Sequence, residues 1–223
     1  ASDVYKRQVG NSAAGKTTLG LAMLKEAGVI KRLEDNVLDF DPEEKKRGIT
    51  LTTSLAELVW NKKLIQLLDT PGYVDFVADV LGALRVADNV VFVVDASQGA
   101  GGLERRWEEV EPGRAKIVFV NKCEGADPKA ALEELRELFG TSAQPLNFWH
   151  GGEVVNLLGS EVPDELGELR EALMESIVEA DDALMEKYLE GAEITPEDLK
   201  GVLKKALVEG TLTPVLFGDC LLY

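Results

Sequence analysis

Residues 10–17 read GNSAAGKT, which fits the spacing G-x-x-x-x-G-K-[ST]. In such a loop the glycines let the backbone curl so that its N–H groups point toward phosphate oxygens. The helix that follows adds the positive end of its dipole. Lys16 would then neutralise the β- and γ-phosphates of a nucleotide, and the Thr17 hydroxyl would hold Mg²⁺. The alternative is a turn that matches the pattern by chance, and partner residues elsewhere in the chain must decide between the two.

A second motif, Asp69-Thr70-Pro71-Gly72, follows an apolar stretch at 64–68. A carboxylate at the end of a strand reaches Mg²⁺ through water, and the Gly72 amide would sense the γ-phosphate. Taken alone, this motif would be an acid and a tight turn at a strand end. Together with the loop at 10–17, it predicts the metal-binding half of a nucleotide site.

Two further candidates lie between and after these motifs. Thr50 ends the sequence RGIT in a charged stretch, and its hydroxyl would reach the metal when a γ-phosphate is present. Taken alone, a threonine in such a stretch is better interpreted as a surface residue. Asn121 and Lys122 end the apolar stretch KIVFV. At that edge of a parallel sheet an amide bonds the base and a lysine stem lies along its ring.

Apolar stretches alternate with helical patterns along the first two thirds of the chain. The patterns predict strands at 51–60, 64–68, 89–95, 116–121 and 212–217, and helices at 19–27, 74–87, 103–110 and 128–139. The charged and poorly periodic segment 29–50 predicts a mobile loop. The predicted fold is therefore α/β: a P-loop NTPase with a mostly parallel sheet, helices on both of its faces, and a mainly helical acidic insertion.

The insertion is recognised by a change of pattern and of charge. Apolar residues at spacings of three and four predict one long helix, with a stripe of Leu166, Leu169, Leu173, Ile177, Ala180 and Leu184. A second helix should begin at Thr195. Residues 161–198 hold 14 acidic and two basic residues, a net charge of -12, which fits either a solvated face or a docking face for a basic partner. We expect a core at 9–140, an inserted subdomain at 141–210 and a last core strand at 211–218.

The two ends do not fit this fold. A central parallel strand is apolar on both faces, yet residues 5–8, which should enter the phosphate loop, read YKRQ. The ends ASDVYKRQ and DCLLY resemble short translated tails joined to a natural sequence. We therefore expect residues 1–8 and 219–223 to be non-native and the first strand to be damaged.

Composition limits the functions that remain. The net charge of -16 disfavours a general nucleic-acid coat, and we expect no sequence-specific nucleic-acid binding. Two cysteines predict no disulfide framework, and the longest apolar run is the length of a strand. We expect a cytoplasmic monomer with no membrane partner.

Five segments, in this order, resemble the GTP-binding domain of translation elongation factor G, and most closely its bacterial elongation factor G-like paralogues: GNSAAGKTTL, DPEEKKRGITL, DTPGYVDF, NVVFVVDASQG and IVFVNK. The later segment, from LREALMESIVEADDALMEKYLEG through TPVLFG, resembles the insertion that this family carries inside that domain. The resemblance covers residues 9–218, so we expect a fragment of a longer factor.

The resemblance implies GTP/GDP and Mg²⁺ as ligands, GTP hydrolysis as the reaction, and the ribosome with its stalk protein as partners. It assigns the metal to Thr17, Thr50 and Asp69. It assigns catalysis to Lys16, Thr50, Gly72 and Tyr73. It assigns the remaining nucleotide contacts to Gly10, Asn11, Ser12, Ala13, Ala14, Gly15, Lys16, Thr17, Thr18, Asn121, Lys122 and Glu124.

Two positions depart from the family pattern. The family usually reads DTPGH, whereas position 73 here is tyrosine, so we expect hydrolysis to be slower by on the order of 10² to 10³. The base-reading motif usually runs N-K-x-D, whereas this chain has Asn121-Lys122-Cys123-Glu124. Glu124 would read guanine from a longer arm, unless a two-residue deletion has removed the acid. The alternative function is a nucleotide-binding module with little or no hydrolysis or with weakened guanine selectivity.

Overall fold

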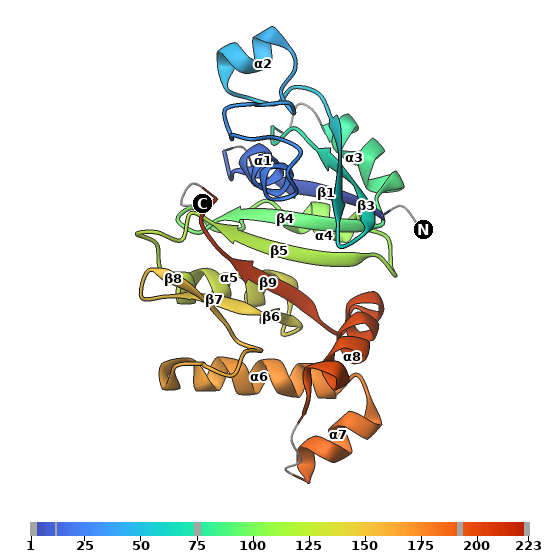
Figure 1. The fold of residues 1–223 in the computed structure, drawn as a ribbon, viewed down its shortest axis with the longest axis vertical. Helices are drawn as coiled ribbons and strands as arrows, with labels where there is room; N and C mark the ends of the chain where they lie inside the picture. Colours follow the sequence, from blue (N-terminus) through green and yellow to red (C-terminus); the bar gives the residue numbers. More distant parts are fainter. Residues whose placement is uncertain (1–3, 12, 74–76, 191–193, 221–223) are drawn as a thin grey trace.

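The computed structural model describes residues 4–11, 13–73, 77–190 and 194–220. Its centre is a sheet with the strand order β2-β3-β1-β4-β5-β9-β6 (Figure 1). The strands are β1 (Val4–Gly10), β2 (Ser54–Trp60), β3 (Lys63–Asp69), β4 (Asn89–Asp95), β5 (Ala115–Asn121), β6 (Ala143–Pro145) and β9 (Thr213–Phe217). The pair β2–β3 is antiparallel and the other neighbouring pairs are parallel, which confirms the mostly parallel sheet.

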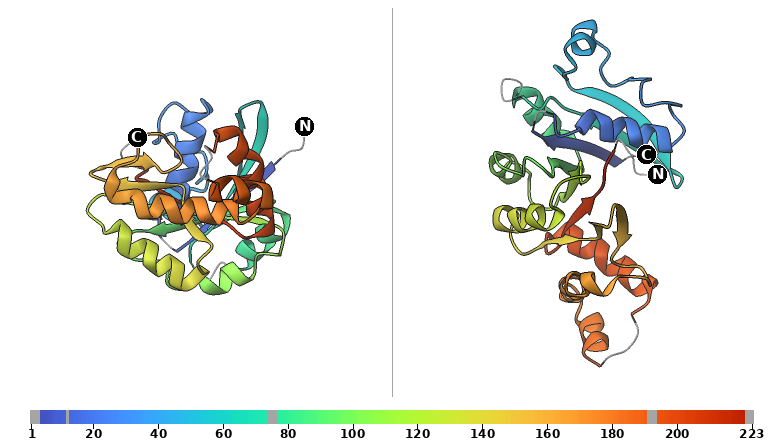
Figure 2. Two further views of the ribbon diagram at one scale, coloured as in Figure 1. Left: turned by 90° about the horizontal axis from the view of Figure 1, so that it is seen from below. Right: turned by 90° about the vertical axis from the view of Figure 1, so that its left-hand side faces the viewer.

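Helices cover both faces of this sheet, as predicted (Figure 2). They are α1 (Lys16–Glu26), α3 (Val77–Val86), α4 (Glu104–Glu108) and α5 (Pro128–Phe139). Strand β4 has the predicted bounds, and its adjacent residues Phe92 and Val93, which point to opposite faces of the sheet, are both buried, as a strand covered on both faces requires. Residues 74–76 of the helix predicted at 74–87 lie outside the described residues.

The segment 29–50, which we expected to be a loop throughout, contains the helix α2 (Pro42–Arg47). Asp41 and Glu44 form a capping box at its start: the Asp41 side chain accepts from the Glu44 amide, and the Glu44 side chain accepts from the Asp41 amide. Gly48, at φ 64°, ends the helix in a left-handed conformation. The prediction was wrong because these local capping signals form a helix without the apolar periodicity on which the prediction relied.

Among its described residues, the insertion contains a hairpin near β9 and helices, of which α6, α7 and α8 lie at the end of the molecule opposite α2 (Figure 1). These elements are β7 (Asn147–His150), β8 (Glu153–Asn156), the 3-10 helix η2 (Asp164–Leu166), α6 (Gly167–Val178), α7 (Asp182–Leu189) and α8 (Pro196–Glu209). The single long helix predicted over 166–184 was wrong. The helix ends at Val178 and a new one starts after Asp181, whose side chain accepts a hydrogen bond from the Leu184 amide at 3.1 Å.

Two segments lie in the sheet that the sequence analysis did not expect there: part of the first strand, which we expected to be damaged, and a short stretch of the insertion. The backbone of residues 4–7 belongs to β1, which pairs with β3 and β4 at the centre of the sheet. Residues 143–145, which we expected in the insertion, form the edge strand β6 beside β9. The subdomain boundaries and the origin of the two ends stay predictions.

The main buried apolar cluster is continuous from the sheet into the insertion. It joins Phe92 of β4 and Phe217 of β9 to Leu173 and Ile177 of α6. A smaller cluster lies between α1 and the β2–β3 hairpin and includes Leu24 and Leu58. Within the described ranges, no helix is long and apolar enough to cross a membrane.

Candidate nucleotide-binding site

Four central strands end at one edge of the sheet and deliver polar groups there. Strands β1, β3, β4 and β5 end at Gly10, Asp69, Asp95 and Asn121. A cavity of about 410 Å³ opens at this edge, and ten predicted site residues line it: Ala13, Gly15, Lys16, Thr17, Thr18, Thr50, Gly72, Tyr73, Asn121 and Lys122. In open α/β sheets ligands bind beyond the carboxyl ends of the strands.

The loop between β1 and α1 requires glycine at its first and last positions. A Cβ on Gly10 would collide with the backbone carbonyl of Val93 on β4. Gly15 has φ 93°, and a Cβ there would collide with the Asn121 side chain. The first glycine therefore lets β1 approach β4, and the second lets the loop turn into α1 against the end of β5.

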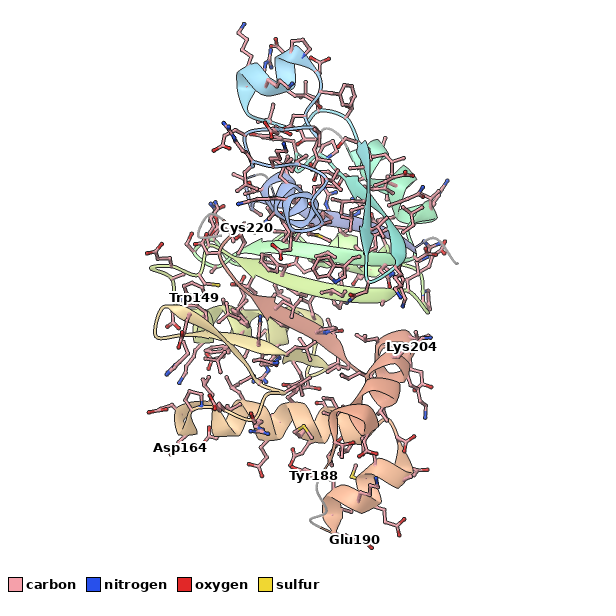
Figure 3. All side chains as sticks on the ribbon, viewed as in Figure 1. Trp149, Asp164, Tyr188, Glu190, Lys204 and Cys220 are labelled. Atoms are coloured by element: carbon pink, nitrogen blue, oxygen red, sulfur yellow. The ribbon has the colours of Figure 1, made fainter. Side chains whose placement is uncertain are left out.

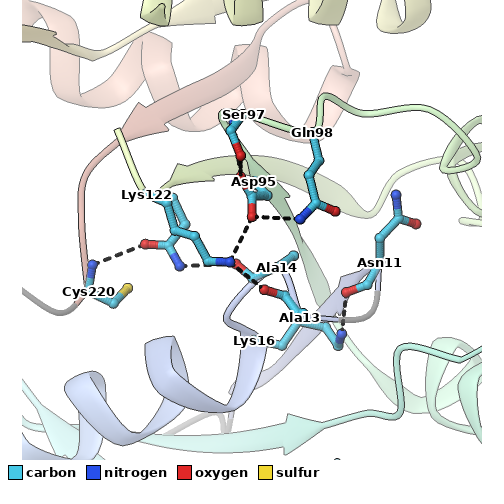
Figure 4. Close-up of polar contacts among 10 residues, drawn as sticks. Asn11, Ala13, Ala14, Lys16, Asp95, Ser97, Gln98, Lys122 and Cys220 are labelled. Carbon is cyan, nitrogen blue, oxygen red and sulfur yellow. Dashed lines mark hydrogen bonds and ion pairs between the residues drawn. The ribbon is translucent and has the colours of Figure 1, made fainter. Parts of the chain in front are cut away.

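Lys16 points back into the loop from the first turn of α1. Its side chain is buried, and its Nζ donates a hydrogen bond to the Asn11 carbonyl at 2.8 Å (Figure 4). Burial lowers the Lys16 pKa to about 8, with Asp69 opposing this effect and Arg106 adding to it. Since an ammonium has three donor hydrogens, the contact with Asn11 leaves donors for phosphate oxygens.

Oxygen atoms of three segments meet beside Lys16. The Thr17 hydroxyl donates to Asp69 Oδ2 at 2.7 Å and lies 3.0 Å from the Thr50 hydroxyl. The Thr50 hydroxyl in turn donates to Asp39 Oδ1 at 2.9 Å. Burial raises the Asp69 pKa to about 6, against the hydrogen bond from Thr17 and the charge of Lys16. A cation at this point would relieve the cost of keeping Asp69 ionised.

These oxygens fit Mg²⁺. Ligands about 2.1 Å from an octahedral Mg²⁺ lie about 3.0 Å apart on adjacent vertices, which is the separation of the Thr17 and Thr50 hydroxyls. Within the described part of the chain, no cluster of three or more His, Cys, Asp or Glu residues could hold a metal by itself. Mg²⁺ at this point would need further oxygen ligands from waters or from a bound phosphate to complete its octahedron.

Asp39 is a site residue that the sequence analysis missed. It is buried, and the side chain of Asn36 binds its carboxylate at 2.8 Å and its amide at 3.0 Å. Both Asn36 and Asp39 line the cavity. The signal that could have revealed Asp39 is its position between the apolar Leu38 and the capping residue Asp41, in a segment treated as a loop.

Asn121 and Lys122 fasten the phosphate loop to the end of β5. The Asn121 amide donates to the Ala14 carbonyl at 3.0 Å, and its oxygen accepts from the Cys220 amide at 3.0 Å (Figure 4). Lys122 Nζ donates to the Ala13 carbonyl at 2.8 Å and to Asp95 Oδ2 at 2.7 Å. Asn121 and Lys122 thus connect the end of β5 to residues 13–14 of the loop.

Asp95 is a second residue to which the sequence analysis gave no role. Burial alone would raise its pKa, but hydrogen bonds from Lys122 and Ser97 outweigh burial and lower the pKa below the ordinary value. Asp95 therefore stays ionised at neutral pH and fixes the Lys122 ammonium beside the loop.

The remaining predicted residues that the structure describes are not part of the cavity lining. Asp69 is buried behind Thr17, Ala14 is buried, and Asn11 contributes its backbone carbonyl to Lys16. Glu124 is exposed and does not line the cavity. Ser12 lies outside the described residues.

A phosphate-type loop after the central strand, with hydroxyl and carboxylate oxygens at its side and an Asn-Lys pair across from it, defines a P-loop nucleotide-binding domain. The family model described as the elongation factor Tu GTP-binding domain matches residues 8–222. The chain belongs to this family of GTP-binding domains, and its fold is that of a P-loop GTPase.

Relatives of known name are similar over most of this chain. An elongation factor G-like protein of Thermotoga maritima is 32% identical over 235 residues, and elongation factor G of Thermotoga neapolitana is 36% identical over 239 residues. These matches cover 96% and 92% of this chain but 34% of each relative. A crystal structure of a Thermus thermophilus protein matches with a TM-score of 0.85 at 34% identity, covering 97% of this chain and 37% of that one. The chain thus spans about a third of the length of these relatives.

Proposed function

We propose that this chain is the GTP-binding domain of an elongation factor G-like translational GTPase, which binds GTP and GDP with Mg²⁺ and hydrolyses GTP. The observation that carries the proposal is the meeting of Lys16, Thr17, Thr50 and Asp69 at the edge where Asn121 and Lys122 also lie. The names of the relatives support the same assignment.

In this proposal the residues around the phosphates divide into phosphate ligands, metal ligands and groups that face the γ-phosphate. Lys16 and the amides of the loop bind the phosphates, and Thr17, Thr50 and Asp69 hold Mg²⁺ when it is bound. The metal supplies neutralisation of the negative charge on the transferred phosphoryl group. Gly72 contacts the γ-phosphate, and Tyr73 takes the position from which the attacking water is oriented. Loss of the γ-phosphate would release the segments that carry Thr50 and Gly72, which gives the switch.

A second candidate function is favoured by two side chains. Tyr73, which lines the cavity, is 41% exposed and offers a hydroxyl where the family usually has an imidazole. Glu124 is exposed and stands outside the cavity lining. These positions favour a nucleotide-binding module with little hydrolysis or with weakened guanine selectivity.

The proposed partners follow from the family and from the charge of the insertion. We infer binding to the ribosome in the cytoplasm, as a monomer, with the acidic helices facing the basic surface of the ribosomal stalk protein. Glu168 and Glu175 of α6 and Glu179 at its C-cap are exposed, as such a contact requires. Helix α7 lies at the far end of the insertion, and its C-cap Glu190 is at the tip of that end (Figure 3).

The deciding experiment is a titration of the protein with fluorescent GDP and a fluorescent GTP analogue in Mg²⁺, with unlabelled GTP and ATP as competitors. The proposal predicts binding that GTP displaces at concentrations well below those of ATP. Displacement by ATP and GTP at equal concentrations would favour the second candidate, because the base would then not be read. Absence of binding to any of these nucleotides would contradict both.

A further inference from the structure

Glu44 of α2 is a fully buried carboxylate outside the residues so far assigned to the site. A buried carboxylate is costly unless hydrogen bonds satisfy it. Glu44 Oε1 accepts from the Leu51 amide at 2.9 Å and from the Thr52 amide and hydroxyl at 3.1 and 3.3 Å. Its Oε2 accepts from the Asp41 amide at 3.1 Å. Burial alone would raise the Glu44 pKa, but these bonds outweigh burial and lower it, so the group is an anion at neutral pH.

The same residue binds the chain on both sides of Thr50. The backbone carbonyl of Glu44 accepts from the amides of Gly48 at 2.8 Å and Ile49 at 3.2 Å. Its side chain binds the amides of the two residues after Thr50, namely Leu51 and Thr52. One residue therefore fixes the backbone before and after Thr50.

The fixed backbone determines where the Thr50 hydroxyl points. That hydroxyl lies 3.0 Å from the Thr17 hydroxyl and 2.9 Å from Asp39. Leu38 anchors the start of this segment in the apolar cluster with Leu24 and Leu58, whereas Val37 and Phe40 are exposed by 51% and 62%. Residues 48–52, which carry Thr50, are held to α2 by the polar contacts of Glu44.

We propose that Glu44 is a positioning residue that presents Thr50 to the metal and γ-phosphate, and so sets the preference of the protein for a nucleoside triphosphate over a diphosphate. This inference rests on the proposed function, because it assumes that a guanine nucleotide binds with Mg²⁺ at the cavity. Glu44 does not line the cavity and acts through its contacts with residues 48–52.

The test uses Glu44→Gln with Glu43→Gln as its matched control. A glutamine at position 44 has one acceptor oxygen, and its NH₂ group cannot accept a hydrogen bond. It can therefore keep the bonds to Leu51 and Thr52 or the bond to Asp41, but not both. Glu43 is the neighbouring acid of the same helix, and its side chain bonds only the exposed Arg47 among the described residues. Both variants remove one negative charge from α2, and only the first disturbs the backbone around Thr50.

The affinity for a non-hydrolysable GTP analogue in Mg²⁺ should fall by about tenfold in Glu44→Gln, since hydrogen bonds to a charged group are involved. The affinity for GDP should stay that of the wild type, because the Thr50 contact needs the γ-phosphate. Unchanged GDP affinity also shows that Glu44→Gln is folded. Glu43→Gln should bind both nucleotides like the wild type.

Limited trypsin digestion gives a second readout, because Lys45, Lys46 and Arg47 are exposed cleavage sites on α2. Without nucleotide, Glu44→Gln should be cut there faster than Glu43→Gln. With the GTP analogue, the wild type should become protected and Glu44→Gln should not.

The outcomes separate the two proposals. If the wild type binds both guanine nucleotides while Glu44→Gln loses affinity for neither, or for both equally, the role of Glu44 is wrong and the proposed function stands. If the wild type binds no guanine nucleotide, the proposed function fails and the role of Glu44 fails with it. Equal tryptic cleavage of the two variants without nucleotide would overturn the role of Glu44 whatever the nucleotide data.

Discussion

At the scale of single residues, Tyr73 is the position of the proposed site that departs from the DTPGH pattern of the family. It lines the cavity next to Gly72 and is 41% exposed. Phosphoryl transfer depends on positioning and electrostatics rather than on covalent chemistry by the protein. A group that orients water poorly therefore slows hydrolysis without weakening nucleotide binding.

Tyr73→His should raise the rate of GTP hydrolysis by on the order of 10² under conditions where the wild type turns over, since a positioning group is restored. The affinity for GDP should not change. Single-turnover hydrolysis of GTP, with and without ribosomes, measures the rate. Tyr73→Phe is the control, because it removes the hydroxyl and adds no imidazole. Equal rates in the histidine and phenylalanine variants would show that residue 73 does not orient the water.

The motifs predicted which residue types meet at the site but not the contacts that hold them. Thr17, Asp69, Asn121 and Lys122 were recognised because each lies at the end of a strand or the start of a helix, where spacing is informative. Asp39 was missed because its neighbours show no apolar periodicity. Its carboxylate is buried and accepts hydrogen bonds from the side chains of Asn36 and Thr50. Tertiary contacts of this kind leave no local pattern in a sequence.

At the scale of elements, the phosphate loop depends on the close approach of β1 to β4. Gly10 is paired with Val93 in the parallel ladder, and any side chain there would meet the Val93 carbonyl. Gly82 of α3 differs, because a Cβ there would meet nothing within 4 Å. Alanine should therefore disturb the structure at Gly10 and be tolerated at Gly82.

Gly10→Ala should lower the free energy of unfolding by about 1–3 kcal/mol, because one strand must shift away from the other. Gly82→Ala should raise it by about 0.5–1 kcal/mol, since alanine is the better helix former at an open position. Urea denaturation followed by circular dichroism gives both values. A Gly10→Ala protein as stable as the wild type would mean that β1 does not approach β4 as described.

Strand β4, helix α5 and the start of helix α8 after its cap Thr195 were predicted to the residue, whereas two other capped helix starts were not. Strand β4 and helix α5 have the predicted bounds, since their burial and end signals agree. Helix α2 was missed and the break at Asp181 was not foreseen, because each depends on one side-chain cap. A cap acts over three residues, which is too short for a search by periodicity to detect.

At the scale of the whole molecule, the molecule is elongated, and the acidic helices α6 and α7 lie at one end of it, away from the cavity at the edge of the sheet (Figure 1). The buried cluster from Phe92 to Ile177 packs them into a continuous core. The acidic residues of the insertion are therefore held at a fixed position relative to the cavity. If this face binds the basic stalk protein, the attraction should depend on salt.

Replacing Glu168, Glu175 and Glu179 together by lysine should weaken binding to the isolated stalk protein by about tenfold at low salt, and by less at high salt. Binding of GDP should be unaffected, because these exposed residues do not line the cavity. Isothermal titration calorimetry at two salt concentrations measures the effect.

The matched control places the same charge change on another surface, with lysine at Glu104, Glu133 and Glu137, which are exposed on α4 and α5. This variant should bind the stalk protein like the wild type. If both triple variants lost the same affinity, total charge would be responsible and the acidic face would have no specific role.

Strands β6 and β9 are neighbours that run parallel, and the whole insertion lies between them in the chain. A parallel pair cannot be joined by a tight turn, since the chain must return the full length of the strand before the second one begins. The insertion is therefore an enlarged crossover connection and not an appendage grafted onto a surface loop. A shortened version that keeps the nucleotide site would have to retain at least about a dozen linking residues, best as one helix packed on the sheet.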